Sequence, residues 1–155
     1  MRNLDFAIPI IAITVCGMAL VRLGVHRRLV APLAFVAGQG VSYAAFVVIA
    51  LFFGGGVGSV LLDVSLDLVV IPVLVLMLVR RPSRPWLYAL IAYEILATIL
   101  NVIALTGMSG SVVVTMLIHI AIRVTAAVTA AMALKHFDEI RPGDASMAAG
   151  TTPKV

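Results

Sequence analysis

Five long apolar runs, each of roughly 20 residues, constrain the fold of this chain more than any other feature of its sequence. A run of this length crosses the hydrocarbon core of a bilayer, about 30 Å thick, when it forms an α-helix. None of the runs alternates polar and apolar residues as barrel strands do, and lipid offers the backbone no other hydrogen-bond partners. The sequence therefore predicts an all-α integral membrane protein, a bundle of five transmembrane helices with short loops. The predicted helices cover residues 6–24, 29–53, 57–79, 86–106 and 111–134.

The composition excludes a soluble domain. Of the 155 residues, 63% are apolar and 12% are charged, whereas soluble domains average roughly 45–50% apolar and about 25% charged residues. A chain of this length has too little interior to hide so much apolar surface from water. We therefore expect the lipid bilayer to be the main partner of the outer helix faces.

The basic residues lie almost entirely in alternate breaks between the runs. Only Arg2 precedes the first run, and the breaks at 54–58 and 107–110 are rich in glycine. By the positive-inside rule, this distribution predicts an outside N-terminus and a cytoplasmic C-terminus in a plasma or inner membrane. The same clusters also suit anionic lipid headgroups, and the two interpretations are compatible. The residues concerned are Arg22, Arg27, Arg28, Arg80, Arg81, Arg84, Lys135, Arg141 and Lys154.

The two ends of the chain are interpreted differently. The first run carries Asp5 and Pro9 and has no clear A-x-A cleavage site, so we expect it to be a mature span rather than a signal peptide. Residues 141–155 are rich in Pro, Gly, Ala, Ser and Thr and have nothing to pack. The sequence thus predicts one transmembrane domain over residues 1–140 and a disordered cytoplasmic tail over residues 141–155. The net charge of +4 reflects this topology, and we expect no binding of nucleic acid.

Five ionisable side chains inside the runs are the candidate functional residues. A charge at the bilayer centre costs on the order of 2.5–3.5 kcal/mol on insertion scales, so these residues must face protein or water. With a rise of 1.5 Å per residue, they lie roughly 9–18 Å from the outer ends of their predicted helices. We therefore expect them to gather between the midplane and the outer surface, as substrate- or ion-binding residues. They are Asp63, Asp67, Glu94, His119 and Arg123.

Uncharged polar residues extend the same helix faces. Helical spacing groups Glu94 with Thr98 and Asn101, and the second run adds Gln39 and Tyr43. In lipid, polar faces of this kind turn toward one another, and small residues let the helices approach closely. We expect these four residues to form a supporting polar face around the charges, although ordinary interhelical hydrogen bonding would also explain them.

The charges inside the runs do not balance. Arg123 is the one certain cation, and depth favours Glu94 or Asp67 as its partner without choosing between them. The remaining negative charge requires bound protons or a bound cation, because an apolar environment disfavours unpaired carboxylates. His119 would offset part of it as an imidazolium.

Three functions fit these features. The first is a proton- or cation-coupled transporter or channel, or a transporter subunit, acting as a homo-oligomer or with other membrane subunits. The second is a non-catalytic accessory or assembly subunit, whose buried charges specify helix contacts. The third is a small lipid-modifying enzyme, because Asp63 and Asp67 are similar to the aspartate pairs with which membrane prenyl- and phospho-alcohol transferases hold magnesium diphosphate. The second acidic motif of those enzymes is missing from this sequence.

Other chemistry finds no support in the sequence. Cys16 is the only cysteine, and His119 is the only histidine within a run, so thiolate metal sites and paired haem ligands are not expected. No serine or cysteine arrangement suggests nucleophilic catalysis. We therefore expect no catalytic residue, no metal and no cofactor.

Overall fold

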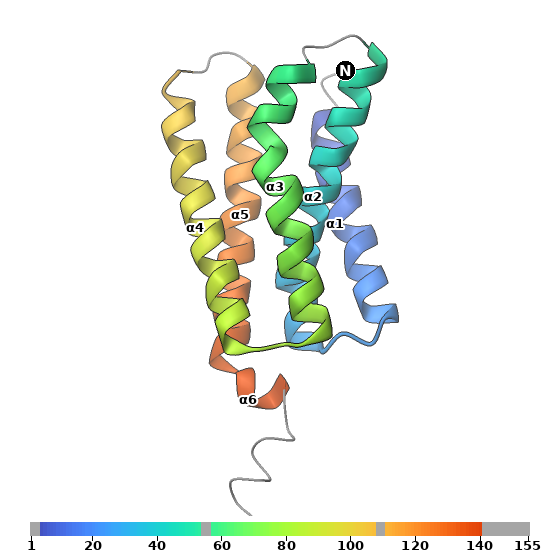
Figure 1. Cartoon of the computed structure of the whole chain (residues 1–155), viewed down its shortest axis with the longest axis vertical. Coiled ribbons are helices and arrows are strands. Elements are labelled where there is room, and N and C mark those ends of the chain that lie inside the picture. Colours follow the sequence, from blue (N-terminus) through green and yellow to red (C-terminus); the bar gives the residue numbers. More distant parts are fainter. Residues whose placement is uncertain (1–3, 54–56, 108–110, 141–155) are drawn as a thin grey trace, which may run out of the picture.

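The computed structural model of the chain describes residues 4–53, 57–107 and 111–140, with side chains at 7–49, 51–52, 64–107, 113–138 and 140. Five long helices run up and down through this part of the chain (Figure 1). This arrangement confirms the predicted all-helical, five-helix fold, and each helix begins and ends within two residues of the expected positions. The helices are α1 (Leu4–Arg22), α2 (Arg27–Phe53), α3 (Val57–Arg80), α4 (Arg84–Leu105) and α5 (Ser111–Lys135).

The turns at one end of the bundle are built from helix-breaking residues. Gly24 has a φ of 72°, which only glycine adopts without strain, and it lets the chain reverse between α1 and α2. Ser83 is the N-cap of α4 in an extended conformation, and Pro85 follows in the first helical turn, where its missing N–H carries no penalty. These two turns bring most of the basic residues to the same end of the bundle.

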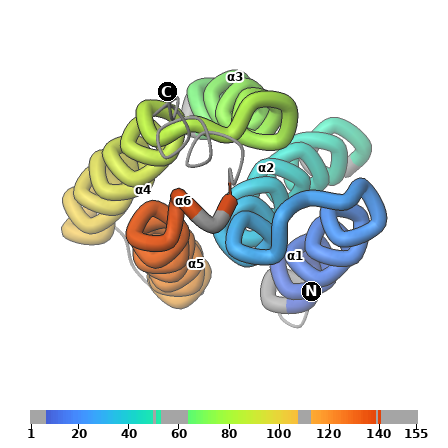
Figure 2. The backbone as a smooth tube through the Cα atoms, turned by 90° about the horizontal axis from the view of Figure 1, so that it is seen from below, coloured from blue at the N-terminus to red at the C-terminus, as the bar shows by residue number. Residues whose placement is uncertain are grey.

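Four of the helices surround a common centre. Viewed end-on, α2, α3, α4 and α5 form a ring in which α5 neighbours α2 and α4, whereas α1 lies outside, against α2 (Figure 2). Gly38 explains the close approach of α1, because a Cβ at this position would lie 2.6 Å from the Cα of Ile13. A larger residue at position 38 would therefore push α1 away from α2.

An apolar core fills the bundle near its basic end. Leu33 of α2, Leu78 of α3 and Leu90 of α4 are completely buried there. Ala126 and Ala130 of α5 face them and are also completely buried, so their small side chains let α5 pack closely. This core supports the polar centre described below.

The outer surface is apolar over most of the bundle. Large side chains such as Val21, Val69 and Ile103 are more than half exposed, which suits lipid rather than water. Within the described residues, three helices are long and apolar enough to cross a membrane: Arg27–Ile49, Arg84–Leu105 and Val113–Lys135. The part of α1 whose side chains are described, Ala7–Arg22, is apolar but shorter. These features agree with the prediction of a multi-pass membrane protein.

A short sixth helix, α6 (Phe137–Ile140), was not expected from the sequence. It lies beneath the long helices (Figure 1). Phe137 and Ile140 are buried against the apolar core. Arg84 at the start of α4 forms an ion pair with Asp138 at 2.9 Å, which ties α6 to the bundle. The predicted disordered tail, residues 141–155, lies outside the described residues.

Candidate functional site

Arg123 of α5 lies at the centre of a buried polar cluster. Its side chain is 2% exposed, and its guanidinium group contacts the three neighbouring helices α2, α3 and α4. A guanidinium in this setting stays protonated and must be compensated by nearby acceptors. The acceptors come from Tyr43, Asp67 and Glu94.

Asp67 of α3 is the more completely paired of the two acids. Arg123 Nη2 donates to both carboxylate oxygens, at 2.8 Å to Oδ1 and 2.7 Å to Oδ2. The hydroxyl of Tyr93 donates a further hydrogen bond to Oδ1. Because every oxygen has a donor and one donor is a cation, Asp67 is held as a carboxylate in a fixed position.

Glu94 of α4 is buried more deeply and paired less well. Its side chain is completely buried, and Arg123 Nη1 donates to Oε2 at 3.2 Å. Its second oxygen, Oε1, has no hydrogen-bond partner among the described residues. A buried carboxylate oxygen without a donor is costly, so Glu94 is the carboxylate of this cluster that has capacity for another ligand.

Residues of α2 cover one side of the cluster. Gln39 Nε2 donates to the hydroxyl of Tyr43 at 3.0 Å, and this hydroxyl also accepts a hydrogen bond from Arg123 Nη2 at 3.3 Å. The ring of Tyr43 stacks on His119, with ring centroids 5.0 Å apart, and Phe46 meets His119 edge-on. This layer fixes the orientation of His119, whose Nδ1 has no partner among the described residues.

The described part of the cluster carries one more negative charge than positive charge. Two carboxylates, Asp67 and Glu94, face the single arginine, Arg123. Four polar atoms of the cluster have no hydrogen-bond partner among the described residues: Gln39 Oε1, Glu94 Oε1, His119 Nδ1 and Arg123 Nε. The arrangement can therefore accept a proton, a small cation or an ordered water without breaking the Asp67–Arg123 pair.

The structure brings together six of the residues that the sequence analysis singled out. Asp67, Glu94, His119 and Arg123 meet in one cluster with Gln39 and Tyr43. Depth alone left the partner of Arg123 open between Asp67 and Glu94, and Arg123 in fact contacts both. Asp63 lies on α3, but its side chain is outside the described residues.

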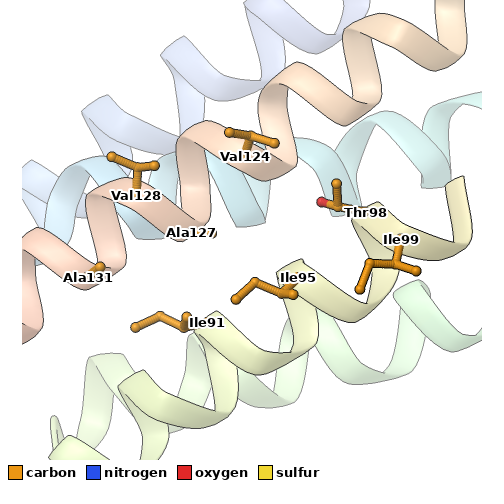
Figure 3. A pocket seen from close by; sticks show the side chains of 8 residues that line it. All are labelled: Ile91, Ile95, Thr98, Ile99, Val124, Ala127, Val128 and Ala131. Carbon is orange, nitrogen blue, oxygen red and sulfur yellow. The ribbon is translucent and has the colours of Figure 1, made fainter. Parts of the chain in front are cut away.

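Two predicted supporting residues do not reach the charges. The hydroxyl of Thr98 donates to the backbone carbonyl of Glu94 at 2.7 Å, and the side chain lines an apolar groove between α4 and α5 on the outside of the bundle (Figure 3). Asn101 is partly buried, and its Nδ2 has no partner among the described residues. Asn101 lies about two turns beyond Glu94, roughly 10 Å along the helix axis, so the rise of α4 rather than its rotation separates Asn101 from the charges.

Tyr93 is the site residue that the sequence analysis missed. It bonds Asp67, and its ring lies 5.8 Å from the guanidinium carbon of Arg123. The signal was its position directly before Glu94 within an apolar run, where a tyrosine hydroxyl needs a hydrogen-bond partner. Phe46 was missed as well, since an apolar residue in an apolar run gives no signal.

No group of three His, Cys, Asp or Glu side chains in the described ranges could hold a metal ion. Comparisons of the chain with protein-family models, curated proteins and solved structures find no match. Fold and site together define a multi-pass membrane protein in which Arg123 forms buried salt bridges with Asp67 and Glu94. Its function must be inferred from this cluster.

Proposed function

We propose that the protein is a proton-coupled transporter or channel, or a subunit of one, in which Glu94 binds the proton. The observation that carries this proposal is the surplus of one carboxylate at a completely buried site. Asp67 and Arg123 neutralise each other, which leaves Glu94 with one long contact and an oxygen without a donor. Protonation of Glu94 removes the surplus negative charge, and the ionised form of Glu94 is the state that binds the next proton.

A proton suits this site better than a metal cation. A metal ion at Glu94 would lie close to the guanidinium of Arg123, which repels it. It would also need several oxygen ligands, and the described ranges offer no cluster of acidic or imidazole groups that could supply them. A proton needs only the one oxygen that lacks a partner.

The other residues of the cluster take supporting roles in this proposal. Arg123 and Asp67 form a fixed pair that holds α3 and α5 around the site. Tyr43, Gln39 and His119 line the side toward α2. Asp63, one helical turn from Asp67 toward the glycine-rich end of α3, is the candidate entry residue.

We further propose that all five long helices cross the membrane, with the N-terminus outside and the C-terminus in the cytoplasm. The basic residues at one end of the bundle support this orientation through the positive-inside rule. Single cysteines in the segments 54–58 or 107–110, introduced into a Cys16→Ala variant, should react with an impermeant thiol reagent from outside. Labelling of cysteines at 80–85 from outside would contradict this topology.

Proton flux in liposomes that contain only this protein tests the main proposal. A potassium diffusion potential drives protons inward, and a trapped pH-sensitive dye reports them. We expect the wild-type protein to acidify the lumen faster than empty liposomes and the Glu94→Gln variant to fall to the empty-liposome rate. Asp138→Asn is the matched control, because it makes the same carboxyl-to-amide change at a side chain that is 80% exposed.

Equal flux through the wild-type and Glu94→Gln proteins, with both folded, would overturn the role of Glu94. Flux that requires sodium ions and does not depend on the proton gradient would show that the coupling ion is a metal cation rather than a proton. These outcomes are separated by repeating the assay with sodium or choline as the only external cation.

A second candidate function is that of an assembly subunit, and one observation favours it. The contacts of Arg123 join α3, α4 and α5, which is what a cluster that specifies helix packing requires. This function predicts a partner that copurifies in mild detergent and no flux through the protein alone. A metal-dependent lipid-modifying enzyme fits less well, because Arg123 and Tyr93 already occupy the oxygens of Asp67.

A further inference from the structure

The turn between α3 and α4 forms a pocket that the proposed proton site does not use. It has a volume of about 520 Å³ and is lined by Arg80, Arg81, Pro82, Ser83 and Trp86. This volume lies within the range of small-molecule binding sites. The pocket opens at the basic end of the bundle, far along α3 and α4 from Asp67 and Glu94.

The charges around this pocket favour an anion. The side chains of Arg80 and Arg81 are exposed, and neither forms an ion pair with any described residue. Asp138 is the only acidic side chain described at this end, and Arg84 already pairs with it. Two neighbouring guanidinium groups therefore have no carboxylate partner among the described residues.

The uncharged residues of the pocket fit a phosphate ester. Ser83 makes no capping hydrogen bond with its hydroxyl, which leaves this hydroxyl available as a donor. Trp86 carries an indole N–H on a large apolar ring, a combination that suits the boundary between headgroups and acyl chains. Guanidinium groups bind phosphate oxygens through paired N–H donors. None of the described residues that line the pocket carries a carboxylate that would compete for these donors.

We propose that this pocket binds the phosphate of an anionic phospholipid headgroup. The end of a helix that spans the bilayer lies at the depth of the headgroups, so the phospholipid is present there at high local concentration. The apolar outer faces of α3 and α4 continue from the pocket and suit the acyl chains. Arg80 and Arg81 hold the phosphate, and Trp86 packs beside the glycerol backbone.

Trp86 also gives a direct readout, because it is the only tryptophan in the chain. The full-length protein is reconstituted into phosphatidylcholine vesicles that contain increasing fractions of brominated phosphatidylglycerol, and quenching of Trp86 emission is recorded. We expect the anionic lipid to quench with at least about fivefold higher apparent affinity than brominated phosphatidylcholine, since each basic residue near an anionic surface contributes about 1 kcal/mol. Arg80→Gln/Arg81→Gln should reduce this preference to about that of the neutral lipid.

The matched control is Arg22→Gln/Arg27→Gln, which removes the same charge from the same end of the bundle but from outside the pocket. This control should keep the preference. Equal loss in both double variants would overturn the proposal, because the basic end would then act only as a diffuse positive surface. A saturable change in Trp86 emission on adding inorganic phosphate to pure phosphatidylcholine vesicles would also overturn it, by assigning the pocket to free phosphate.

Discussion

Arginine contacts carboxylates in two regions of this protein, with the same chemistry but different surroundings. Arg84 and Asp138, at the basic end, are 2.9 Å apart and have side chains that are 54% and 80% exposed. Arg123, at the centre of the bundle, contacts Asp67 and Glu94 at 2.7 Å and 3.2 Å, and its side chain is 2% exposed. Water can replace a lost partner at the exposed contact between Arg84 and Asp138. It cannot do so at the buried contacts of Arg123.

The difference in exposure determines what an excess charge requires in each region. At the basic end, Arg80 and Arg81 are exposed and pair with no described carboxylate, so they are solvated and available to the proposed anionic ligand. At the centre, water cannot solvate the carboxylate oxygen of Glu94 that lacks a donor, and in the proposed function a proton neutralises this carboxylate. The proposed lipid site is thus exposed to solvent, whereas the proposed proton site is shielded from it.

Removal of Arg123 should produce the largest effect on stability. Arg123→Leu leaves Asp67 and Glu94 buried without their only cation, and breaking a buried ion pair costs roughly 3–5 kcal/mol. We expect a loss of this order in the free energy of unfolding, measured by thermal or denaturant unfolding in detergent. A loss below about 1 kcal/mol, the range of exposed pairs, would mean that the centre is wetter than its burial indicates.

The two acids should respond differently when Arg123 is absent. Asp67 keeps the hydrogen bond from Tyr93, whereas Glu94 keeps no donor from the described residues. We therefore expect Glu94→Gln to restore more of the stability of Arg123→Leu than Asp67→Asn does. In the presence of Arg123 the order should be the same, with Asp67→Asn more damaging than Glu94→Gln, because the latter leaves a neutral Asp67–Arg123 pair. A double-mutant cycle with strictly additive changes would contradict a contact between these charges.

The smallest effect should come from the exposed pair at the basic end. Arg84→Gln removes the contact with Asp138 and the cation–π contact with Phe137, and exposed pairs contribute about 0–1 kcal/mol. We expect the free energy of unfolding of the bundle, measured as for Arg123→Leu, to decrease by no more than this amount. A shift as large as that of Arg123→Leu would show that α6 is as important to the fold as the buried cluster.

The helices and the charged cluster could be predicted because each depends on a strong local rule. Apolar runs of membrane length bounded by Gly, Pro and Arg predict helices, and α1 to α5 follow them closely. Buried ionisable residues must meet one another, so the gathering of Asp67, Glu94 and Arg123 followed from their cost in lipid. The short helix α6 could not be predicted, since four residues beyond a span carry no periodic signal.

The finer arrangement of the site depends on helix rotation, which sequence spacing does not determine. Glu94 and Asp67 have similar depths, so only the packed structure distinguishes the bidentate partner from the one with a single contact. Rotation of α4 also decides that Tyr93 reaches Asp67 while Thr98 turns to the outer groove (Figure 3). These outcomes follow from side-chain packing between helices, which no single run of sequence encodes.

The central claim is that Glu94 is the surplus carboxylate and exchanges a proton, and infrared difference spectroscopy tests it most directly. Spectra of the reconstituted protein are recorded over the neutral pH range, in which exposed carboxylates stay ionised. The account predicts a carbonyl band of a protonated carboxylic acid that changes with pH in the wild-type protein and in Asp138→Asn, and that is absent in Glu94→Gln. The same band in folded Glu94→Gln, or no such band in the wild-type protein, would contradict the account.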